Sequence, residues 1–200
     1  MTSRLEQQLA FILEIDKLKA VLRQSLISDG SRRENSAEHS WQIALMALLL
    51  AEHADETVDA ARAATMLLIH DIVEIDAGDA FLYDEAAQAA KATLEQAAAK
   101  RIFGLLPEEQ AARFTKLWEE FETGDTADAR YARAMDRLMP MMLNVATDGR
   151  AWRAHGVSAD KVLARNAVIA EGSQALWDYA QNMIEGAVSR GVIPATTSRS

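Results

Sequence analysis

The sequence predicts an all-α, single-domain protein, and three observations support this fold class. Apolar residues recur at the three- and four-residue spacing of amphipathic helices along most of the chain. The strong helix formers Ala, Leu, Glu, Gln, Arg and Met are abundant. No stretch of alternating β-branched residues indicates a strand, and neither a repeat nor a linker divides the 200 residues. A chain of this length can bury enough surface to fold as one unit.

The expected helices differ in how clearly their ends are marked. Asn35 and Glu38 have the form of a capping box, so a helix is expected to begin there; its residues are apolar almost all round, which favours a central position. Pro107 followed by two glutamates is typical of a first helical turn. One domain is expected over residues 1–193, followed by a flexible tail over residues 194–200. The helices are expected at about residues 4–26, 37–54, 58–74, 85–103, 107–121, 126–145 and 158–190, with a break of the last at Gly172 and a loop over residues 147–157.

The composition and charge exclude several classes of function. The chain contains no cysteine, which excludes disulfides, thiolate zinc sites and cysteine nucleophiles. Its formal net charge of −9 disfavours tight binding to a nucleic-acid backbone, although a small anionic substrate remains compatible with local positive charge. The longest apolar run, Ile43–Ala51, is much shorter than the about 20 residues of a membrane span, and residues 1–8 lack a signal-peptide core. The sequence therefore indicates a cytoplasmic protein without nucleic-acid or membrane partners.

The clearest chemical signal is His70 followed directly by Asp71 inside the apolar helical segment Met66–Glu74. Polar groups in such a setting are expected to be buried and to need partners. An imidazole and a carboxylate on adjacent helical positions can together hold one divalent cation such as Zn, Mn, Co or Fe. The alternative is a hydrogen-bonded core histidine beside an unrelated aspartate.

The end of this segment is rich in acidic residues. Four acidic residues occur here with no Lys or Arg between them: Asp71, Glu74, Asp76 and Asp79. Carboxylates near a helix carboxy terminus oppose the helix dipole and repel one another, and a bound cation would reverse both effects. His39 lies in the first turn of the preceding expected helix, so antiparallel packing would bring it to the same place. Together these observations favour a metal site.

The order His39, then His70–Asp71, then Asp136 resembles the HD-domain metal-dependent phosphohydrolases. The resemblance covers most of the chain, and it implies an HD-type helical bundle with one divalent ion (Mn, Co, Zn, Mg, Fe or Ni) bound by these four residues. The lack of a further histidine near the motif favours a single ion. Four motifs look like those of one branch of this family, the bacterial 5′-deoxynucleotidases and their HD-domain-containing relatives. They lie within about Leu18–Leu143 and are Arg33–Ser40, His70–Glu74, Gly78–Asp79 and Met135–Leu138.

The resemblance also implies roles for three further residues. Glu74 would act on the attacking water, and its spacing from His70 puts both residues on one side of a helix. Asp79 would face the substrate phosphate, and Arg23 would neutralise phosphate charge. Simpler alternatives remain open: a solvated carboxylate for Glu74 and for Asp79, and a helix-surface charge for Arg23. For the ligand Asp136, the alternative is an exposed side chain paired with a neighbouring arginine.

The chain departs from the deoxynucleotidase pattern at three places, one of which is a loop between Arg23 and His39 that is one residue longer. Gln24 stands where the family enzyme has tryptophan, and the segment 80–84 lacks that enzyme's Thr-Pro and Lys features. A preference for 2′-deoxyribose is therefore not predicted. The remaining histidines lie outside the motifs: His53 is expected on the surface near a helix end, and His155 in a loop with a structural or surface role.

The leading hypothesis is a metal-dependent phosphohydrolase acting on a small phosphomonoester, with a nucleoside (deoxy)ribonucleotide 5′-monophosphate as the first candidate. The metal would bind a phosphate oxygen and lower the pKa of a water molecule. Two alternatives stay open: a phosphodiesterase using the same site, and a non-catalytic nucleotide-binding or helical scaffold protein with a structural metal. A small phosphorylated metabolite is the expected partner, and the resemblance implies a homodimer.

Overall fold

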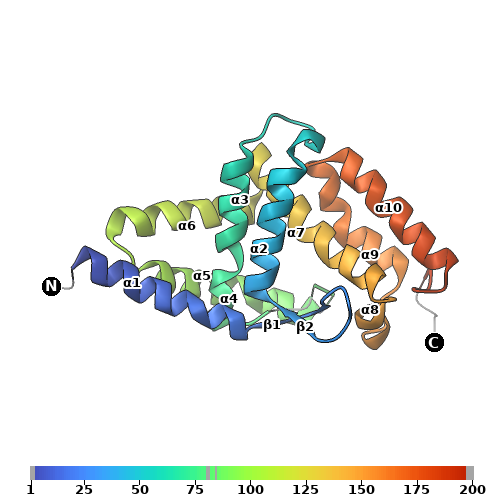
Figure 1. Ribbon diagram of the computed structural model, residues 1–200, viewed down its shortest axis with the longest axis horizontal. Coiled ribbons are helices and arrows are strands. Elements are labelled where there is room, and N and C mark those ends of the chain that lie inside the picture. Colours follow the sequence, from blue (N-terminus) through green and yellow to red (C-terminus); the bar gives the residue numbers. More distant parts are fainter. Residues whose placement is uncertain (1–2, 80–81, 84, 197–200) are drawn as a thin grey trace.

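The computed structural model describes residues 3–79, 82–83 and 85–196, and helices dominate these ranges (Figure 1). The all-α, single-domain fold class is confirmed. The two strands are β1 (Leu22–Leu26) and β2 (Arg33–Asn35), and short 3₁₀ helices are η1 (Asp16–Ala20), η2 (Ala51–His53), η3 (His70–Val73) and η4 (Ala167–Glu171). The α-helices are α1 (Arg4–Ile15), α2 (Ser36–Leu49), α3 (Ala60–Ile69), α4 (Glu74–Ala77), α5 (Glu85–Phe103), α6 (Glu108–Thr123), α7 (Ala127–Ala146), α8 (Arg150–Ala154), α9 (Ala159–Asn166) and α10 (Gln174–Ser189).

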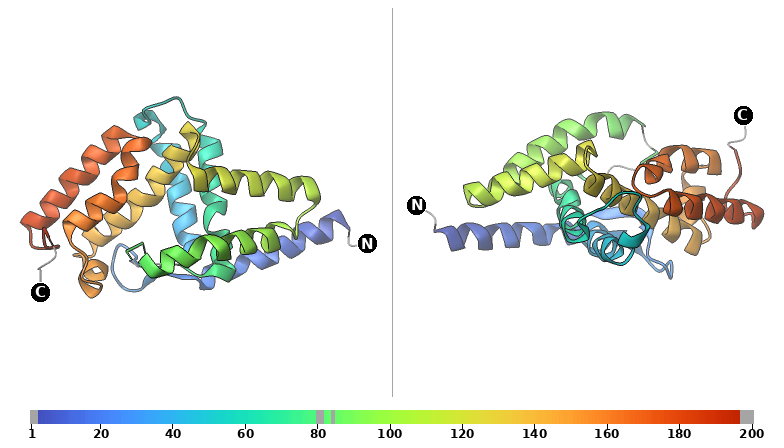
Figure 2. Two further views of the ribbon diagram at one scale, coloured as in Figure 1. Left: turned by 180° about the vertical axis from the view of Figure 1, so that it is seen from behind. Right: turned by 90° about the horizontal axis from the view of Figure 1, so that it is seen from above.

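Helices α2, α3 and α7 form the centre of the molecule. Helices α1, α5 and α6 extend to one side of α2 and α3, and α8, α9 and α10 to the other, with the termini at opposite ends (Figures 1 and 2). Helix α7 packs against α2, α3, α6, α10 and η4. Fully buried side chains such as Ile43, Met66 and Met135 fill the space between the three central helices. The hydroxyl of Tyr131 on α7 donates a 2.9 Å hydrogen bond to the carbonyl oxygen of Ala47 on α2.

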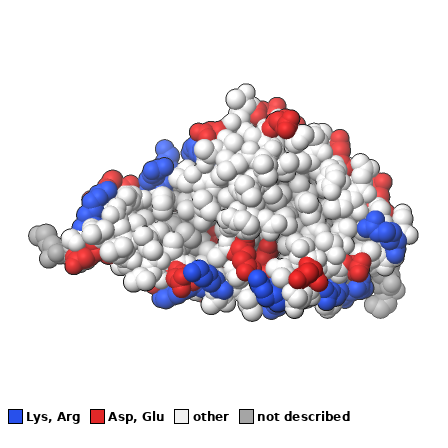
Figure 3. Space-filling view, in the orientation of Figure 1, with Lys and Arg blue, Asp and Glu red and all other residues white. Residues whose placement is uncertain are grey.

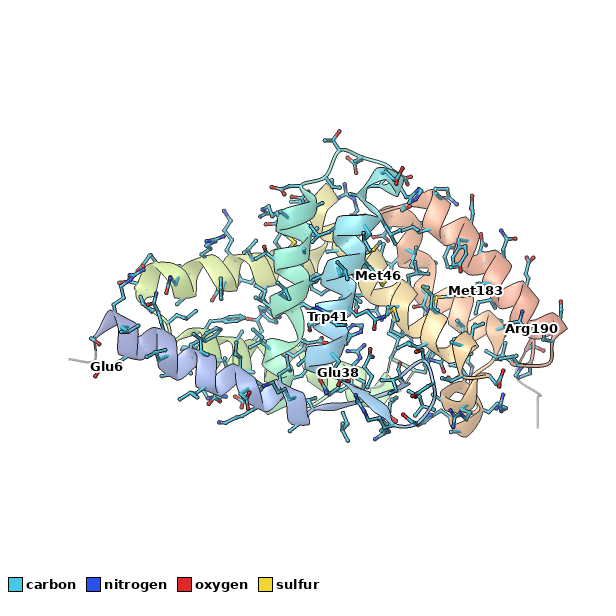
Figure 4. All side chains as sticks on the ribbon, in the orientation of Figure 1. Glu6, Glu38, Trp41, Met46, Met183 and Arg190 are labelled. Carbon is cyan, nitrogen blue, oxygen red and sulfur yellow. The ribbon has the colours of Figure 1, made fainter. Side chains whose placement is uncertain are left out.

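The expected capping box at the start of α2 is confirmed. The Asn35 side chain accepts a 2.9 Å hydrogen bond from the Glu38 amide, and the Glu38 carboxylate accepts one from the Asn35 amide. Ser3 and Glu6 form the same arrangement at the start of α1, and Figure 4 labels both glutamates at the amino ends of their helices. The box begins α2 at Ser36, which sets His39 in its first turn.

The expected helix over residues 4–26 is wrong in its second half, and no strand was predicted. Helix α1 ends at Ile15, and Leu22–Leu26 pairs antiparallel with β2, with Leu22 opposite Asn35. The partner strand lies beyond a turn, so the local pattern carries no sign of the pairing. The expected loop 147–157 is also wrong in part, since α8 forms within it.

Two other helix boundaries depend on tertiary contacts. The expected helix over residues 58–74 is divided, because the chain tightens into η3 and continues as α4. The expected break at Gly172 is confirmed: a Cβ atom there would lie 2.5 Å from the carbonyl oxygen of Arg130 on α7, so only glycine allows this close approach. In the tail, the carbonyl oxygen of Pro194 accepts a 2.8 Å hydrogen bond from the Ala159 amide, and residues 197–200 lie outside the described residues.

Helix α2 is central, but only one of its faces is buried. Ile43 and Ala47 are fully buried, whereas Trp41 and Leu48 are 64 % and 52 % exposed. Leu68 of α3 is exposed beside them, and the surface over α2 and α3 shows no charged side chains at its centre (Figure 3). Trp41 lies in front of the ribbon in Figure 4. Among the described residues, no helix is long and apolar enough to cross a membrane.

Candidate metal centre and active site

The junction of α3 and η3 positions His70. Its Nδ1 lies 2.8 Å from the carbonyl oxygen of Leu67, one turn earlier, so Nδ1–H donates there and Nε2 is left to bind a metal. Nε2 is buried and has no hydrogen-bond partner. It lies 3.0 Å from Asp71 Oδ1, close enough for attraction but without hydrogen-bond geometry. His70 is thus held in the tautomer that a metal ligand requires.

The other predicted ligands come from two more elements and meet His70. Asp136 on α7 places Oδ1 3.0 Å from His39 Nε2 and 3.6 Å from His70 Nε2. Ligand atoms of His39, His70 and Asp136 all lie within 4.8 Å of one another. Asp71, the fourth predicted ligand, adjoins them through His70. The packing of α2 against α3 brings His39 to His70 and Asp71, as expected for the helices over residues 37–54 and 58–74, and α7 adds Asp136.

This donor set fits a divalent cation. Two imidazole nitrogens and two carboxylates are ligands that Zn, Mn, Co and Fe accept. Burial, followed by the charge of Arg23, lowers the pKa of His39 to about 4, so its imidazole is neutral and can bind a metal. Burial alone would lower the pKa of His70, but Asp71 and Asp136 outweigh it and raise that pKa to about 10. A proton on His70 thus supplies the positive charge that a bound metal would otherwise provide.

Glu74 lies beside this cluster and is held by a hydrogen bond. It is buried, and its Oε2 accepts a 2.7 Å hydrogen bond from the Ser36 hydroxyl on α2. Burial, and then the charge of Asp71, raise the pKa of Glu74 to about 8. A carboxyl group with a pKa near neutrality is suited to exchange protons with a reacting water.

Arg23 and Asp79 also lie at the cluster, whereas Asp76 does not. Arg23 is on β1 rather than on the expected helix, and its Nη1 donates a 2.8 Å hydrogen bond to Asp71 Oδ2. Asp79 follows Gly78 and is half-buried. The carboxylate of Asp76 points elsewhere, because it pairs with Arg101 of α5 at 2.7 Å. One of the four acids at the helix end therefore has an ordinary structural partner.

A cavity of about 810 Å³, counting its open mouth, borders the cluster. His39 and His70 do not line it and adjoin it only through their aspartate neighbours. The two histidines outside the motifs, His53 in η2 and His155 after α8, are both exposed. The predicted site residues that line the cavity are Arg23, Asp71, Glu74, Asp79 and Asp136, with Gln24 beside them.

Sequence reasoning missed Glu34. It is 1 % exposed on β2, and its Oε2 lies 3.6 Å from His39 Nδ1 and 3.4 Å from Arg23 Nε. Burial outweighs the charge of Arg23 and raises the pKa of Glu34 to about 7. If Nε2 of His39 binds a metal, its proton resides on Nδ1, which faces this carboxylate. Its position within the motif Arg33–Ser40 was the signal that could have found it.

Comparison with known proteins assigns the chain to a family. Residues 15–177 match the HD domain. The chain belongs to the HD-domain family. A crystal structure of a "Predicted metal-dependent phosphohydrolase" from Magnetospirillum magnetotacticum MS-1 is 55 % identical, superposes with a TM-score of 0.92 and covers 96 % of each chain. This HD-domain protein therefore shares its family and its fold with a predicted metal-dependent phosphohydrolase, in agreement with the resemblance that its motifs carry.

More distant relatives have names that specify a reaction. Human "5′-deoxynucleotidase HDDC2" is 30 % identical over 130 residues, which are 64 % of this chain and 62 % of the relative. Escherichia coli "5′-deoxynucleotidase YfbR" is 30 % identical over 128 residues, 60 % of this chain and 63 % of the relative. The chain thus matches less than two thirds of the length of these relatives. A protein from Pyrococcus furiosus, 22 % identical with a TM-score of 0.61, shares the fold.

Proposed function

We propose that this HD-domain protein hydrolyses nucleoside 5′-monophosphates, with either deoxyribose or ribose, to a nucleoside and inorganic phosphate. We further propose that one divalent ion is bound by His39, His70, Asp71 and Asp136. The observation that carries the proposal is the meeting of two imidazole nitrogens and two carboxylates from separate elements at the edge of a cavity. The names of the relatives at about 30 % identity support the substrate class.

The residues around the cavity can divide the reaction between them. A bound metal ion supplies charge that polarises the phosphate and lowers the pKa of a water molecule. Glu74, anchored by Ser36, takes the proton of the attacking water through its second oxygen. Arg23, fixed by Asp71, places positive charge at the cavity wall for the phosphate oxygens. Asp79 gives a proton to the leaving oxygen of the sugar.

A screen of phosphate release tests this proposal. The purified protein is stripped with a chelator, loaded with Mn, Co, Zn, Mg, Fe or Ni in turn, and assayed with nucleoside monophosphates. We expect release that depends on the metal and stops on chelation. A phosphodiesterase would instead cleave bis-esters under the same conditions. Metal binding without release from any ester would favour the non-catalytic scaffold.

The homodimer and the cytoplasmic location stay predictions. We propose that a second copy would bind over the exposed apolar side chains of α2 and α3, among them Trp41, Leu48 and Leu68, because this surface carries no charge at its centre. Sedimentation of the wild type and of Trp41→Glu tests it. A wild-type monomer at micromolar concentration would contradict the dimer.

A further inference from the structure

The cavity continues past the metal centre along one face of α7. Five residues of α7 line the cavity: Asp136, Arg137, Pro140, Met141 and Asn144. Their spacing puts them on one side of a helix. From Asp136 to Asn144 the helix advances by about 12 Å, at 1.5 Å per residue. The cavity is therefore long enough to hold a ligand that extends well beyond its phosphate.

The end of the cavity at Asn144 is partly aromatic and adjoins α8, since the Gly149 amide donates a 2.7 Å hydrogen bond to the Asn144 carbonyl oxygen. Trp152 of α8 and Tyr83 line it, with Asn166 of α9 beside them. Trp152 and Asn166 are each 2 % exposed, and Asn166 Nδ2 donates a 3.3 Å hydrogen bond to the Tyr83 hydroxyl. The wall is thus fixed by packing from two helices. An aromatic wall suits a flat ring.

Asn144 leaves one hydrogen-bonding group unused at this end. Its Nδ2 donates a 2.9 Å hydrogen bond to the carbonyl oxygen of Pro140, while its Oδ1 is buried and has no partner. The side chain is 6 % exposed. A buried carbonyl oxygen without a donor is unfavourable, and such groups are rare in folded proteins. The cavity therefore offers an acceptor for which a ligand can supply the donor.

We infer that the Asn144 end of the cavity is a subsite for a nucleobase, with Asn144 Oδ1 accepting a hydrogen bond from an N–H group of the ring or its amino substituent. The inference rests on the proposed function, since it places the phosphate at the Asp136 end. A sugar phosphate fills only the charged end. A nucleotide also reaches the apolar wall and the unpaired oxygen.

Changing the substrate tests the subsite without changing the protein. For the metal-loaded wild type, we expect kcat/KM for AMP to exceed that for ribose 5-phosphate by about 100-fold, because a buried acceptor rejects ligands that leave it unpaired. Purine riboside 5′-monophosphate keeps the ring but has no N–H donor on it. We expect this nucleotide to be about tenfold worse than AMP. Equal kcat/KM for all three esters would overturn the inference while leaving the proposed function intact.

A variant and a binding assay separate the two proposals. In Asn144→Leu we expect the preference for AMP over ribose 5-phosphate to fall by about tenfold or more, mainly through KM. Thr147→Val is the matched control, because Thr147 lies on the next turn, donates only to the backbone carbonyl oxygens of Leu143 and Asn144 and does not line the cavity. Calorimetric binding of adenosine, which has no phosphate, should weaken in Asn144→Leu alone. That result would hold even if no ester were hydrolysed; unchanged adenosine binding would refute the subsite.

Discussion

Two clusters of charged side chains lie at the two ends of α3, and they differ in whether their polar atoms have partners. At the start of the helix, Arg62 pairs with Glu120 of α6 at 2.5 Å and with Asp128 of α7 at 3.3 Å. At the other end, His70 and Asp71 meet Asp136, also of α7. Helix α7 thus contributes one acidic residue to each cluster, Asp128 and Asp136, which are eight residues apart.

The cluster at the start of α3 pairs its acids fully. Glu120 also accepts a 2.7 Å hydrogen bond from the Thr126 hydroxyl, and Asp128 accepts one of 2.8 Å from the Asp59 amide. The cluster at the other end leaves buried polar atoms without partners, on Arg23, Glu34, His39 and His70. A cluster that only stabilises the fold satisfies its groups, whereas one that binds a ligand keeps some of them unsatisfied. The difference marks the functional end of α3.

Replacing a metal ligand should have the largest effect. Asp136→Ala removes the carboxylate that contacts both histidines, so we expect loss of metal and loss of phosphate release together. Elemental analysis of protein purified without chelator, beside the release assay, measures both. The matched variant at the paired cluster, Asp128→Ala, should keep both. Retention of stoichiometric metal in Asp136→Ala would remove it from the ligand set.

Replacing Glu74 should separate catalysis from metal binding. Glu74→Gln keeps the shape and the hydrogen bond from Ser36 but cannot take a proton. We expect turnover to fall by about 10²–10⁴-fold with near-normal metal content, which is the usual contribution of acid–base assistance. Glu120→Gln is the control at the other cluster and should keep wild-type turnover. An empty metal site in Glu74→Gln would make Glu74 a ligand instead.

Glu34→Gln tests a residue that acts through its neighbours. The change removes the carboxylate facing His39 Nδ1 and Arg23 Nε. Losing such an outer partner typically reduces metal affinity by about 10–100-fold. Titration with a competing chelator measures the affinity directly. If the affinity is unchanged, Glu34 serves only to balance the charge of Arg23.

The stability of the metal-free protein should depend on pH in one direction. The pKa of His70 is raised from 6.5 to about 10, and that of Glu74 from 4.5 to about 8. Both raised values contribute stability that is present at low pH and is lost as pH rises through the folded pKa. We expect Tm to fall between about pH 6.5 and pH 10 without metal. Added metal should reverse the fall, because it replaces the proton on His70. If the Tm of the metal-free protein rises between about pH 6.5 and pH 10, the prediction is wrong.

Breaking the paired cluster should have the smallest effect. Arg62 is partly exposed, with 34 % of its side chain accessible, so water screens its ion pairs. We expect Arg62→Met to lower the free energy of unfolding by about 1 kcal/mol or less. Urea unfolding measures this, and phosphate release should stay at the wild-type rate. A large loss of activity would show that the two ends of α3 are coupled.

The sequence by itself determined the helical class, most helix positions and the order of the motifs. Periodicity and capping act over a few residues, so the box at Asn35 and the break at Gly172 were visible without a structure. The pair His70–Asp71 was also a local signal, because a polar pair in an apolar segment needs partners. The capping box and the polar pair can be recognised from neighbouring residues alone, whereas the break that Gly172 marks also depends on its close contact with α7.

Only the tertiary structure decided which distant groups meet. The strand β1 places Arg23 against Asp71, and its pairing with β2 depends on residues beyond a turn. Glu34 and Asn144 gained their significance from buried atoms that lack partners, which no spacing rule reports. Asp76 looked like its acidic neighbours in sequence, yet Arg101 from α5 pairs with it. Long-range packing sets these contacts, because burial and pairing are properties of the folded chain.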